Sequence, residues 1–296
     1  MGILNKLFVT LRAQGKHPLN RKSSWCAAWE FSVAQMAARL VPGEVCVPFP
    51  NETRLLIPPR MKGAAHFIYP GLCEFEDMAF VMHFLRPSDM FIDAGANIGA
   101  YTVLAAGVAG SRVMAFEPAP TTFRSLTLNI QLNGLADRVT AFNVALGRGE
   151  GILKMTEGLG TENSICPSSS GGGLAVPVRA LDFLLGEALP VLLKIDVEGF
   201  ETQVFAGAKK MLHQPSLQAM IVEKSGNGEI YGFDENALHR EIRETGFFPC
   251  SYSPFQRSLC LISTAVSGNI IYVRNIETAQ QRLRQSAPFR TVGISV

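Results

Sequence analysis

The nine residues 91–99, FIDAGANIG, constrain the fold of this chain more than any other stretch. Residues 90–92 form a short apolar run typical of a buried strand, and residues 101–106 have the pattern of a following helix. Gly95 and Gly99 stand between them, where the backbone must turn tightly and let a ligand approach. The stretch therefore predicts a strand, a turn and a helix that together bind a cofactor.

The spacing within this turn favours one kind of cofactor. A dinucleotide fingerprint reads G-x-G-x-x-G, and its backbone amides receive a pyrophosphate. Here the pattern from Asp93 is D-x-G-x-x-x-G, and Asn97 takes the place of the middle glycine. This spacing resembles the first motif of Rossmann-like methyltransferases, whose cofactor, S-adenosylmethionine, has no phosphate to be held.

The next apolar strand, residues 112–116, ends in Glu117 and Pro118. An acidic side chain at the carboxyl end of the second strand of such a unit can accept hydrogen bonds from both hydroxyls of a ribose. We therefore expect Glu117 to bind the ribose of the cofactor. The alternative is a solvated glutamate at the end of a strand.

Composition excludes several classes of function. The chain has 296 residues, 47% hydrophobic and 18% charged, which suits one sizeable α/β domain with an appendage. A net charge of +2, with no basic stripe interleaved with aromatic residues, predicts no nucleic-acid partner. Glu30, Gln35 and Arg39 interrupt the most apolar helix candidate, so no membrane association is predicted.

The cysteines and the beginning of the chain both bear on the expected cellular location. Six cysteines are scattered without any C-x-x-C pair, which predicts neither a zinc site nor a disulfide framework. The apolar stretch before Arg12 is too short for a signal peptide. We therefore expect a soluble protein of the reducing cytoplasm.

Strands and helices alternate from residue 74 onward, which predicts a parallel sheet with helices on both faces. The expected helices are 74–85, 121–133, 201–213 and 235–245, and the expected strands include 139–144, 190–195 and 219–222. Later strands within 248–273 would form an antiparallel closing hairpin.

Three segments follow from this pattern. Residues 74–275 form the cofactor domain, and residues 276–296 form a peripheral C-terminal tail. Residues 1–73 form an extension with a helix at 24–41 and two short strands around residues 50–52. The extension would serve as a substrate wall or lid; a packing cap or a homodimer contact is the alternative.

Several motifs, in order and spacing, resemble the FkbM-type family of S-adenosylmethionine-dependent methyltransferases. They lie at residues 74, 91–99, 115–118, 129–130, 133, 144–147, 181–182, 193–199 and 207–208. The resemblance covers roughly residues 74–225. It implies a Rossmann-like class I methyltransferase fold with a doubly wound, mostly parallel sheet. It also implies methylation of a hydroxyl on a small-molecule acceptor such as a sugar, a polyketide or another secondary metabolite.

The resemblance completes the expected cofactor site. It places Glu74 near the methionine end of the cofactor; an ordinary carboxylate at a helix start is the alternative. Asn143 and Val144 would border the adenine. The expected cofactor-binding residues are Glu74, Asp93, Gly95, Asn97, Gly99, Glu117, Asn143 and Val144.

Residues 194–199, KIDVEG, end the most apolar strand and open into the crevice beyond the strand ends, where a methyl acceptor must lie. Methyl transfer to oxygen is an in-line displacement that requires an aligned nucleophile and a group to take its proton. Asp196 and Glu198 share one face of the strand extension, and Glu223 ends the neighbouring strand. Each is a candidate base or orienting group, whereas Lys194 is expected to form an ion pair with a carboxylate.

Other interpretations stay open at this stage. The three carboxylates could hold magnesium or calcium, although no metal site is predicted, and Glu198 could cap the helix after residue 199. The histidines are isolated in sequence, and His66 is the one to test as a base. A nicotinamide-dependent oxidoreductase would need the glycine that Asn97 replaces. A catalytically silent methyltransferase-like adaptor is the third possibility.

Overall fold

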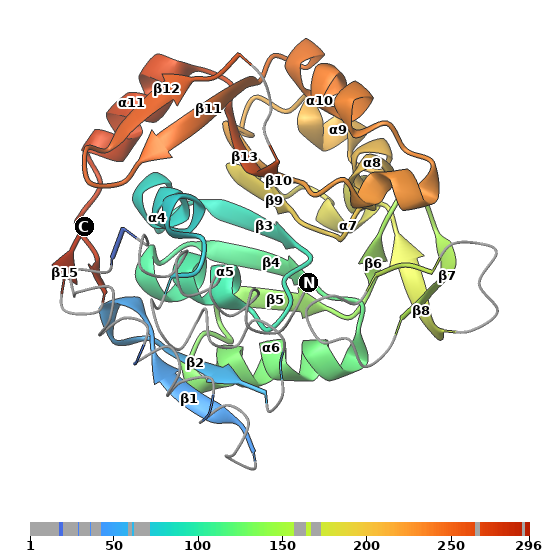
Figure 1. Ribbon diagram of the computed structural model, residues 1–296, viewed down its shortest axis with the longest axis horizontal. Coiled ribbons are helices and arrows are strands. Elements are labelled where there is room, and N and C mark those ends of the chain that lie inside the picture. The colour runs from blue at the N-terminus through green and yellow to red at the C-terminus, as the bar shows by residue number, and fades with distance from the viewer. Residues whose placement is uncertain are drawn as a thin grey trace.

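The computed structural model in Figure 1 describes residues 18–19, 29, 36, 43–58, 61, 72–156, 164–166, 173–263, 267–291 and 294–296. Among these residues, the largest sheet has eight strands in the order β12-β11-β13-β10-β9-β3-β4-β5. The strands are β3 (Met90–Ala94), β4 (Arg112–Phe116), β5 (Val139–Phe142), β9 (Leu192–Ile195), β10 (Ala219–Lys224), β11 (Phe248–Ser253), β12 (Ser258–Leu261) and β13 (Gly268–Val273).

The sheet is parallel from β5 to β10 and antiparallel beyond it. Strand β13 runs antiparallel to β10, and β11 pairs antiparallel with both β13 and β12. This arrangement confirms the doubly wound, mostly parallel α/β fold with an antiparallel closing edge.

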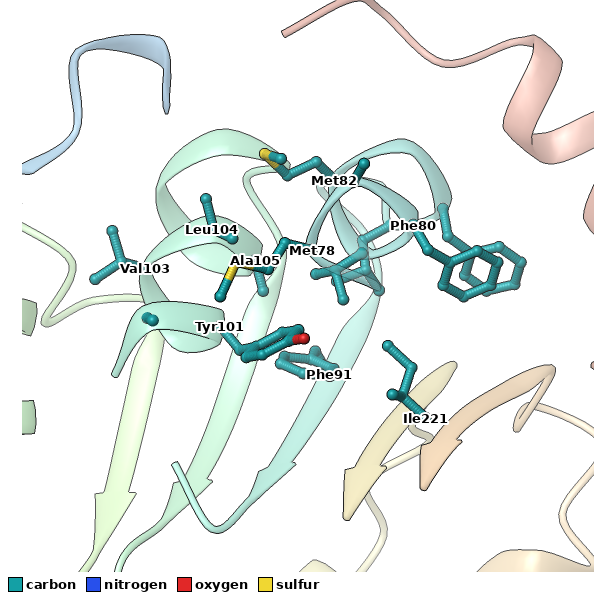
Figure 2. Packing of buried hydrophobic residues seen from close by; sticks show 14 of the residues in the cluster. Met78, Phe80, Met82, Phe91, Tyr101, Val103, Leu104, Ala105 and Ile221 are labelled. Carbon is teal, nitrogen blue, oxygen red and sulfur yellow. The ribbon is translucent and has the colours of Figure 1, made fainter. Parts of the chain in front are cut away.

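Helices cover both faces of the sheet (Figure 1). One face packs against α4 (Phe75–Phe84), α5 (Ala100–Val103), the π-helical turn η2 (Leu104–Val108), α6 (Pro120–Leu132) and α11 (Ile276–Arg284). The other packs against α7 (Leu181–Leu185), α8 (Glu201–Ala206), α9 (Lys209–Leu212) and α10 (Glu235–Glu244). Adjacent strand residues face opposite sides of the sheet, and both sides are covered, so the central strands are mostly apolar, with Asp93 of β3 and Lys194 of β9 as buried exceptions. In Figure 2, Phe91 and Ile221 of the sheet pack near Met78 of α4 and Tyr101 of α5.

The helix expected over residues 201–213 is two helices, α8 and α9. A Cβ at Gly207 would lie 1.9 Å from the carbonyl oxygen of Gly147, so the backbone approaches its neighbour closely at this point. The Asp182 carboxylate then accepts hydrogen bonds from the amides of Lys210 and Met211 and starts α9 anew. A tertiary contact thus divides a continuous helical pattern.

The tail expected to be peripheral packs into the core. Helix α11 lies against α4, and the side chains of Phe289 and Val296 are buried. Arg282 donates hydrogen bonds to the Phe84 carbonyl and the Asp89 carboxylate. The last carbonyls of a helix lack partners within it, and Arg282 supplies one from the tail.

The two short strands expected around residues 50–52 are present as the antiparallel pair β1 (Val45–Pro48) and β2 (Arg54–Ile57), joined by η1 (Pro50–Glu52). Leu55 and Ile57 are buried in the same core as α4. Apart from Trp29 and Met36, the helix expected at 24–41 lies outside the described residues. Within the described part of the chain, no helix combines the length and the apolar character needed to cross a membrane.

Strands β6 (Ala145–Leu146), β7 (Gly151–Met155) and β8 (Leu174–Arg179) form a small separate sheet in the order β6-β8-β7. Another short pair, β14 (Arg290–Thr291) and β15 (Ile294–Ser295), follows α11. A short helical turn, η4 (Asn227–Tyr231), follows β10. Ala145 and Leu146 of β6 and Met155 of β7 line the cavity described next, and η4 supports its wall through Tyr231.

Candidate functional site

A cavity of about 420 Å³ opens at the carboxyl ends of β3, β4, β9 and β10, the edge where the sequence predicts a crevice. The turn after β3, the end of β4 and the segment after β9 form one side of it. Met155 of β7, together with Ser164 and Ile165, lines another side. The hydroxyl of Tyr231 donates a hydrogen bond to the Ile165 carbonyl (2.7 Å) and fixes that wall.

Gly95 brings the two loops of the site into contact. Its φ is +81°, and a Cβ at this position would lie 1.8 Å from the carbonyl oxygen of Asp196. The amides of Gly95 and Ala96 both donate hydrogen bonds to the Phe116 carbonyl. The turn after β3 is therefore pressed between β4 and the loop after β9, where no larger residue fits.

Asn97 adopts the left-handed region, with φ +52°. Its side-chain Oδ1 accepts a hydrogen bond from the backbone amide of Ile98 (2.8 Å), and its backbone amide donates one to Oε2 of Glu117 (3.0 Å). Asparagine tolerates this conformation better than other non-glycine residues. This explains how Asn97 can stand where a dinucleotide fingerprint has glycine.

Glu117 lines the cavity and is 7% exposed. Its Oε1 accepts a hydrogen bond from the amide of Ala119 (2.9 Å), so each carboxylate oxygen is held by one backbone amide. Burial raises the pKa of Glu117 to about 7. Each oxygen retains a second lone pair, so the group is able to accept hydrogen bonds from a diol.

The expected cofactor residues divide into those that line the cavity and those that support it. Glu74, Gly95, Asn97, Glu117 and Val144 line it. Asp93, Gly99 and Asn143 do not belong to its lining.

The supporting residues have distinct contacts. Asp93 is fully buried, and its Oδ2 accepts a hydrogen bond from the Thr102 hydroxyl (2.6 Å). Burial raises the pKa of Asp93, and the Lys194 cation opposes this change. Asn143 donates to the carbonyls of Glu117 and Pro118 and so holds the chain after β4.

Glu74 lies at the start of α4, and its Oε2 accepts a hydrogen bond from the Tyr101 hydroxyl (2.7 Å). Burial raises the pKa of Glu74, while the Lys194 cation lowers it. Tyr101 also lines the cavity, and its ring lies 4.7 Å from Nζ of Lys194. Tyr101 stands in an ordinary helical pattern, so the sequence gives no signal of this role.

Lys194 forms the expected ion pair, and its partner is Asp196, with 2.7 Å between Nζ and Oδ2. The lysine is only 2% exposed. Burial by itself would lower its pKa, but the carboxylates of Asp196, Asp93 and Glu74 outweigh burial and raise it. A cation therefore lies in the wall of the cavity, and Asp196 lines the cavity beside it.

Glu198 departs from the expected extended strand. Strand β9 ends at Ile195, and Glu198 has φ +55°, so it does not share a strand face with Asp196. Its Oε2 accepts a hydrogen bond from Nδ2 of Asn227 (3.2 Å), and it lines the cavity. The N-cap position of helix α8 is Phe200, and Glu198 lies two residues before it. A strained glutamate held beside a cavity is typical of a functional position.

Glu201 is a residue that the sequence analysis missed. It is 2% exposed, and its Oε1 accepts hydrogen bonds from the amides of Val197 (3.0 Å) and Gly199 (3.2 Å). Burial raises its pKa to about 7. Its sequence signal is an acid in the first turn of a helix, which is common in proteins and does not reveal that it supports a loop.

Glu223 of β10 lines the cavity, and one of its oxygens, Oε2, is buried without a hydrogen-bond partner among the described residues. Burial raises its pKa well above the ordinary value, and the carboxylates of Asp196 and Glu198 add to this effect. His66 lies outside the described residues. Across the described ranges, no group of three or more His, Cys, Asp or Glu side chains is arranged to hold a metal ion.

The fold and this cavity define an α/β protein of the class I methyltransferase type. Residues 93–249, more than half of the chain, match the methyltransferase FkbM domain, and the chain therefore belongs to this family of methyltransferases.

Curated relatives are named as methyltransferases. Methyltransferase sdnD of Sordaria araneosa is 27% identical over 54% of this chain and 74% of its own length. Methyltransferase 1 of Beauveria bassiana is 33% identical over 41% of this chain and 59% of its own length. The 31-O-demethyl-FK506 methyltransferase FkbM of Streptomyces tacrolimicus is 37% identical over 32% of this chain and 36% of its own length. The matches thus cover less than two thirds of the last two relatives.

Among solved structures, methyltransferase FkbM of Methylobacillus flagellatus KT matches with a TM-score of 0.44 and 16% identity. The match covers 84% of this chain and 60% of that one.

Proposed function

We propose that this protein transfers a methyl group from S-adenosylmethionine to a hydroxyl of a small or medium-sized metabolite, a sugar or a secondary metabolite. The observation that carries this proposal is that Glu117, the Gly95 turn and Asp196 line the same cavity. A relative named for 31-O-demethyl-FK506 supports oxygen as the acceptor atom. The family assignment also argues against a nicotinamide-dependent oxidoreductase.

The residues of the cavity fit this cofactor. The free lone pairs of Glu117 suit the two hydroxyls of a ribose. Phe116 and Val144 add apolar surface suited to an adenine, and Glu74 adds a carboxylate for the amino-acid end. The Gly95 turn lets backbone approach a ligand and has no cradle for a pyrophosphate.

When bound, S-adenosylmethionine supplies an electrophilic methyl group, so transfer forms an O–CH3 bond, breaks an S–CH3 bond and releases the hydroxyl proton. Asp196 has Oδ2 held by Lys194, which leaves Oδ1 to orient the acceptor hydroxyl and take its proton. Glu223, with its raised pKa, is protonated at neutral pH and is suited to donate a hydrogen bond. Glu198 and His66 are the alternative bases.

Calorimetric titration with S-adenosylmethionine, S-adenosylhomocysteine and NAD tests the cofactor. The first two are expected to bind and NAD is not; tight binding of NAD without S-adenosylhomocysteine would overturn the proposal. Incubation with a methyl-labelled donor and a panel of hydroxylated acceptors, read by mass spectrometry, then tests transfer. Cofactor binding with no transfer to any acceptor would favour the silent adaptor.

A further inference from the structure

Asn129 of helix α6 and Asn133 at its C-cap both face the open edge of β2. Asn133 accepts a hydrogen bond from the amide of Arg54 and donates one to its carbonyl, both at 2.8 Å. Asn129 does the same with Leu56, at 2.6 Å from the amide and 3.0 Å to the carbonyl. Each side-chain amide thus pairs with both backbone groups of one strand residue, as a neighbouring strand would.

The spacing of the two asparagines explains why this pairing works. Four residues along a helix advance by about 6 Å. Two residues along a strand advance by about 6.6 Å. Asn129 and Asn133 therefore stay in register with Leu56 and Arg54, and together they attach the β1–β2 hairpin to α6.

Asn129 has one contact that Asn133 lacks. Its Nδ2 also donates to the carbonyl of Ile98 (2.8 Å), and Asn129 is 0% exposed. Helix α5 has its N-cap at Gly99, so the Ile98 carbonyl precedes the helix and has no place in its hydrogen-bond ladder. Asn129 satisfies this buried carbonyl, whereas Asn133 contacts the hairpin at a more exposed position.

Two side chains therefore hold the left-handed turn from opposite ends. Glu117 accepts the amide of Asn97 on the cavity side. Asn129 donates to the carbonyl of Ile98 and does not belong to the cavity lining. Asn97 and Ile98 both line the cavity, so their positions shape it directly.

We propose that Asn129 is a positioning residue of the cofactor site. It holds the 97–98 backbone in its binding conformation from behind the cavity and couples that backbone to the β1–β2 hairpin. This inference rests on the proposed function, because it takes the turn after β3 as the cofactor-binding turn.

The test compares Asn129→Ala with Asn133→Ala as a matched control. Both variants detach one asparagine from β2, but only the first frees the Ile98 carbonyl. We expect the dissociation constant for S-adenosylhomocysteine to rise about five-fold to ten-fold in Asn129→Ala, as for the loss of one hydrogen bond. It should stay within about two-fold of the wild-type value in Asn133→Ala. Equal affinities in the two folded variants would overturn the inference.

Amide hydrogen exchange without ligand gives a readout independent of the cofactor. Residues 97–102 should exchange faster in Asn129→Ala than in Asn133→Ala, and equal rates would overturn the inference. If Asn129→Ala does not fold, Asn129→Ser provides the same comparison with less loss of volume and polarity. If the wild-type protein fails to bind S-adenosylhomocysteine, the proposed function fails, while the exchange rates still decide whether Asn129 holds the turn.

Discussion

The turns after β3 and after β9 are built alike. Each contains a left-handed residue that is not glycine, Asn97 in the first and Glu198 in the second, and each then reaches a left-handed glycine. A buried glutamate accepts hydrogen bonds from backbone amides of each turn: Glu117 from Asn97 in the first, and Glu201 from Val197 and Gly199 in the second. Burial raises the pKa of both glutamates to about 7.

The turns differ in the direction of the side chain of the residue that has the left-handed backbone conformation. The side chain of Asn97 accepts a hydrogen bond from the Ile98 amide of its own turn. The backbone of the first turn is therefore left to face the cavity. Glu198 instead accepts a hydrogen bond from the neighbouring Asn227 of η4, and Glu198 and Asp196 both line the cavity. Under the proposed function, the first turn would serve binding through its backbone shape, and the second would serve chemistry through its side chains.

The largest effect is expected where the two turns touch. Gly95→Ala would place a Cβ against the Asp196 carbonyl, and this backbone group cannot rotate away. We expect a loss of about 4 kcal/mol or more in the free energy of unfolding, measured by denaturant titration. Gly134→Ala is the control, because Gly134 has φ +64° with nothing within 4 Å, and should cost only about 1 kcal/mol. Equal costs would show that the turns are not in close contact.

A change in the second turn should affect turnover. Asp196→Asn keeps the size of the side chain and removes its charge, so we expect turnover to fall by about 10²-fold or more. The dissociation constant for S-adenosylhomocysteine should change little, which also serves as the control for folding. A variant with the wild-type rate would transfer the role of base to Glu198 or His66 and leave Glu223 as the group that orients the acceptor. Loss of activity on chelation and its recovery with magnesium would instead recast the carboxylates as metal ligands.

A change at the first turn should affect affinity. Glu117→Ala is expected to weaken cofactor binding by about 1.5 to 3 kcal/mol, the range for losing charge-assisted hydrogen bonds. Because the pKa of Glu117 is about 7, affinity in the wild type should strengthen as pH rises through 7 and the carboxylate forms. Calorimetry at several pH values measures both effects. An unchanged affinity in a folded Glu117→Ala variant would contradict the assignment of Glu117 as the residue that binds the ribose.

The smallest effect is expected on stability, when each of the two buried glutamates, Glu117 and Glu201, is replaced by glutamine. Glu201 uses one oxygen for both of its amides, so the carbonyl of Gln in Glu201→Gln can replace it. Glu117 uses both oxygens, so in Glu117→Gln an NH2 group must meet a backbone amide.

The pH dependence of stability has a defined sign. A raised carboxyl pKa in the folded state contributes stability that is present below the ordinary pKa of about 4.5 and is lost as pH rises through about 7. Glu201→Gln should therefore gain stability relative to wild type between pH 5 and 8, on the order of 1 to 2 kcal/mol. Thermal or denaturant unfolding across this range measures the difference. Parallel stability curves for the two proteins would contradict the assignment.

Much of this arrangement follows from local sequence. Apolar runs predicted the parallel strands, and their order placed Glu117 and Asp196 at one edge of the sheet. Alternation along β9 also predicted that Lys194 pairs with a carboxylate. These inferences succeed because strand ends and side-chain alternation are fixed by backbone geometry.

The parts that sequence did not predict depend on contacts between distant segments. The break at Gly207 arises from the close approach of Gly147, and the packing of the tail depends on the carbonyl of Phe84 that Arg282 caps. Asn143 supports the chain after β4 and does not line the cavity, because its side chain turns to the Glu117 carbonyl. No local pattern encodes such partners.

The left-handed conformation of Glu198 has a consequence for laboratory evolution. A non-glycine residue held there costs about 1 to 3 kcal/mol, and glycine or asparagine would relieve most of it. A library screened for heat resistance alone should therefore accumulate replacements at this position. Screening the same library for product formation should remove them if the carboxylate contributes to the reaction, so the two screens would select in opposite directions at one residue.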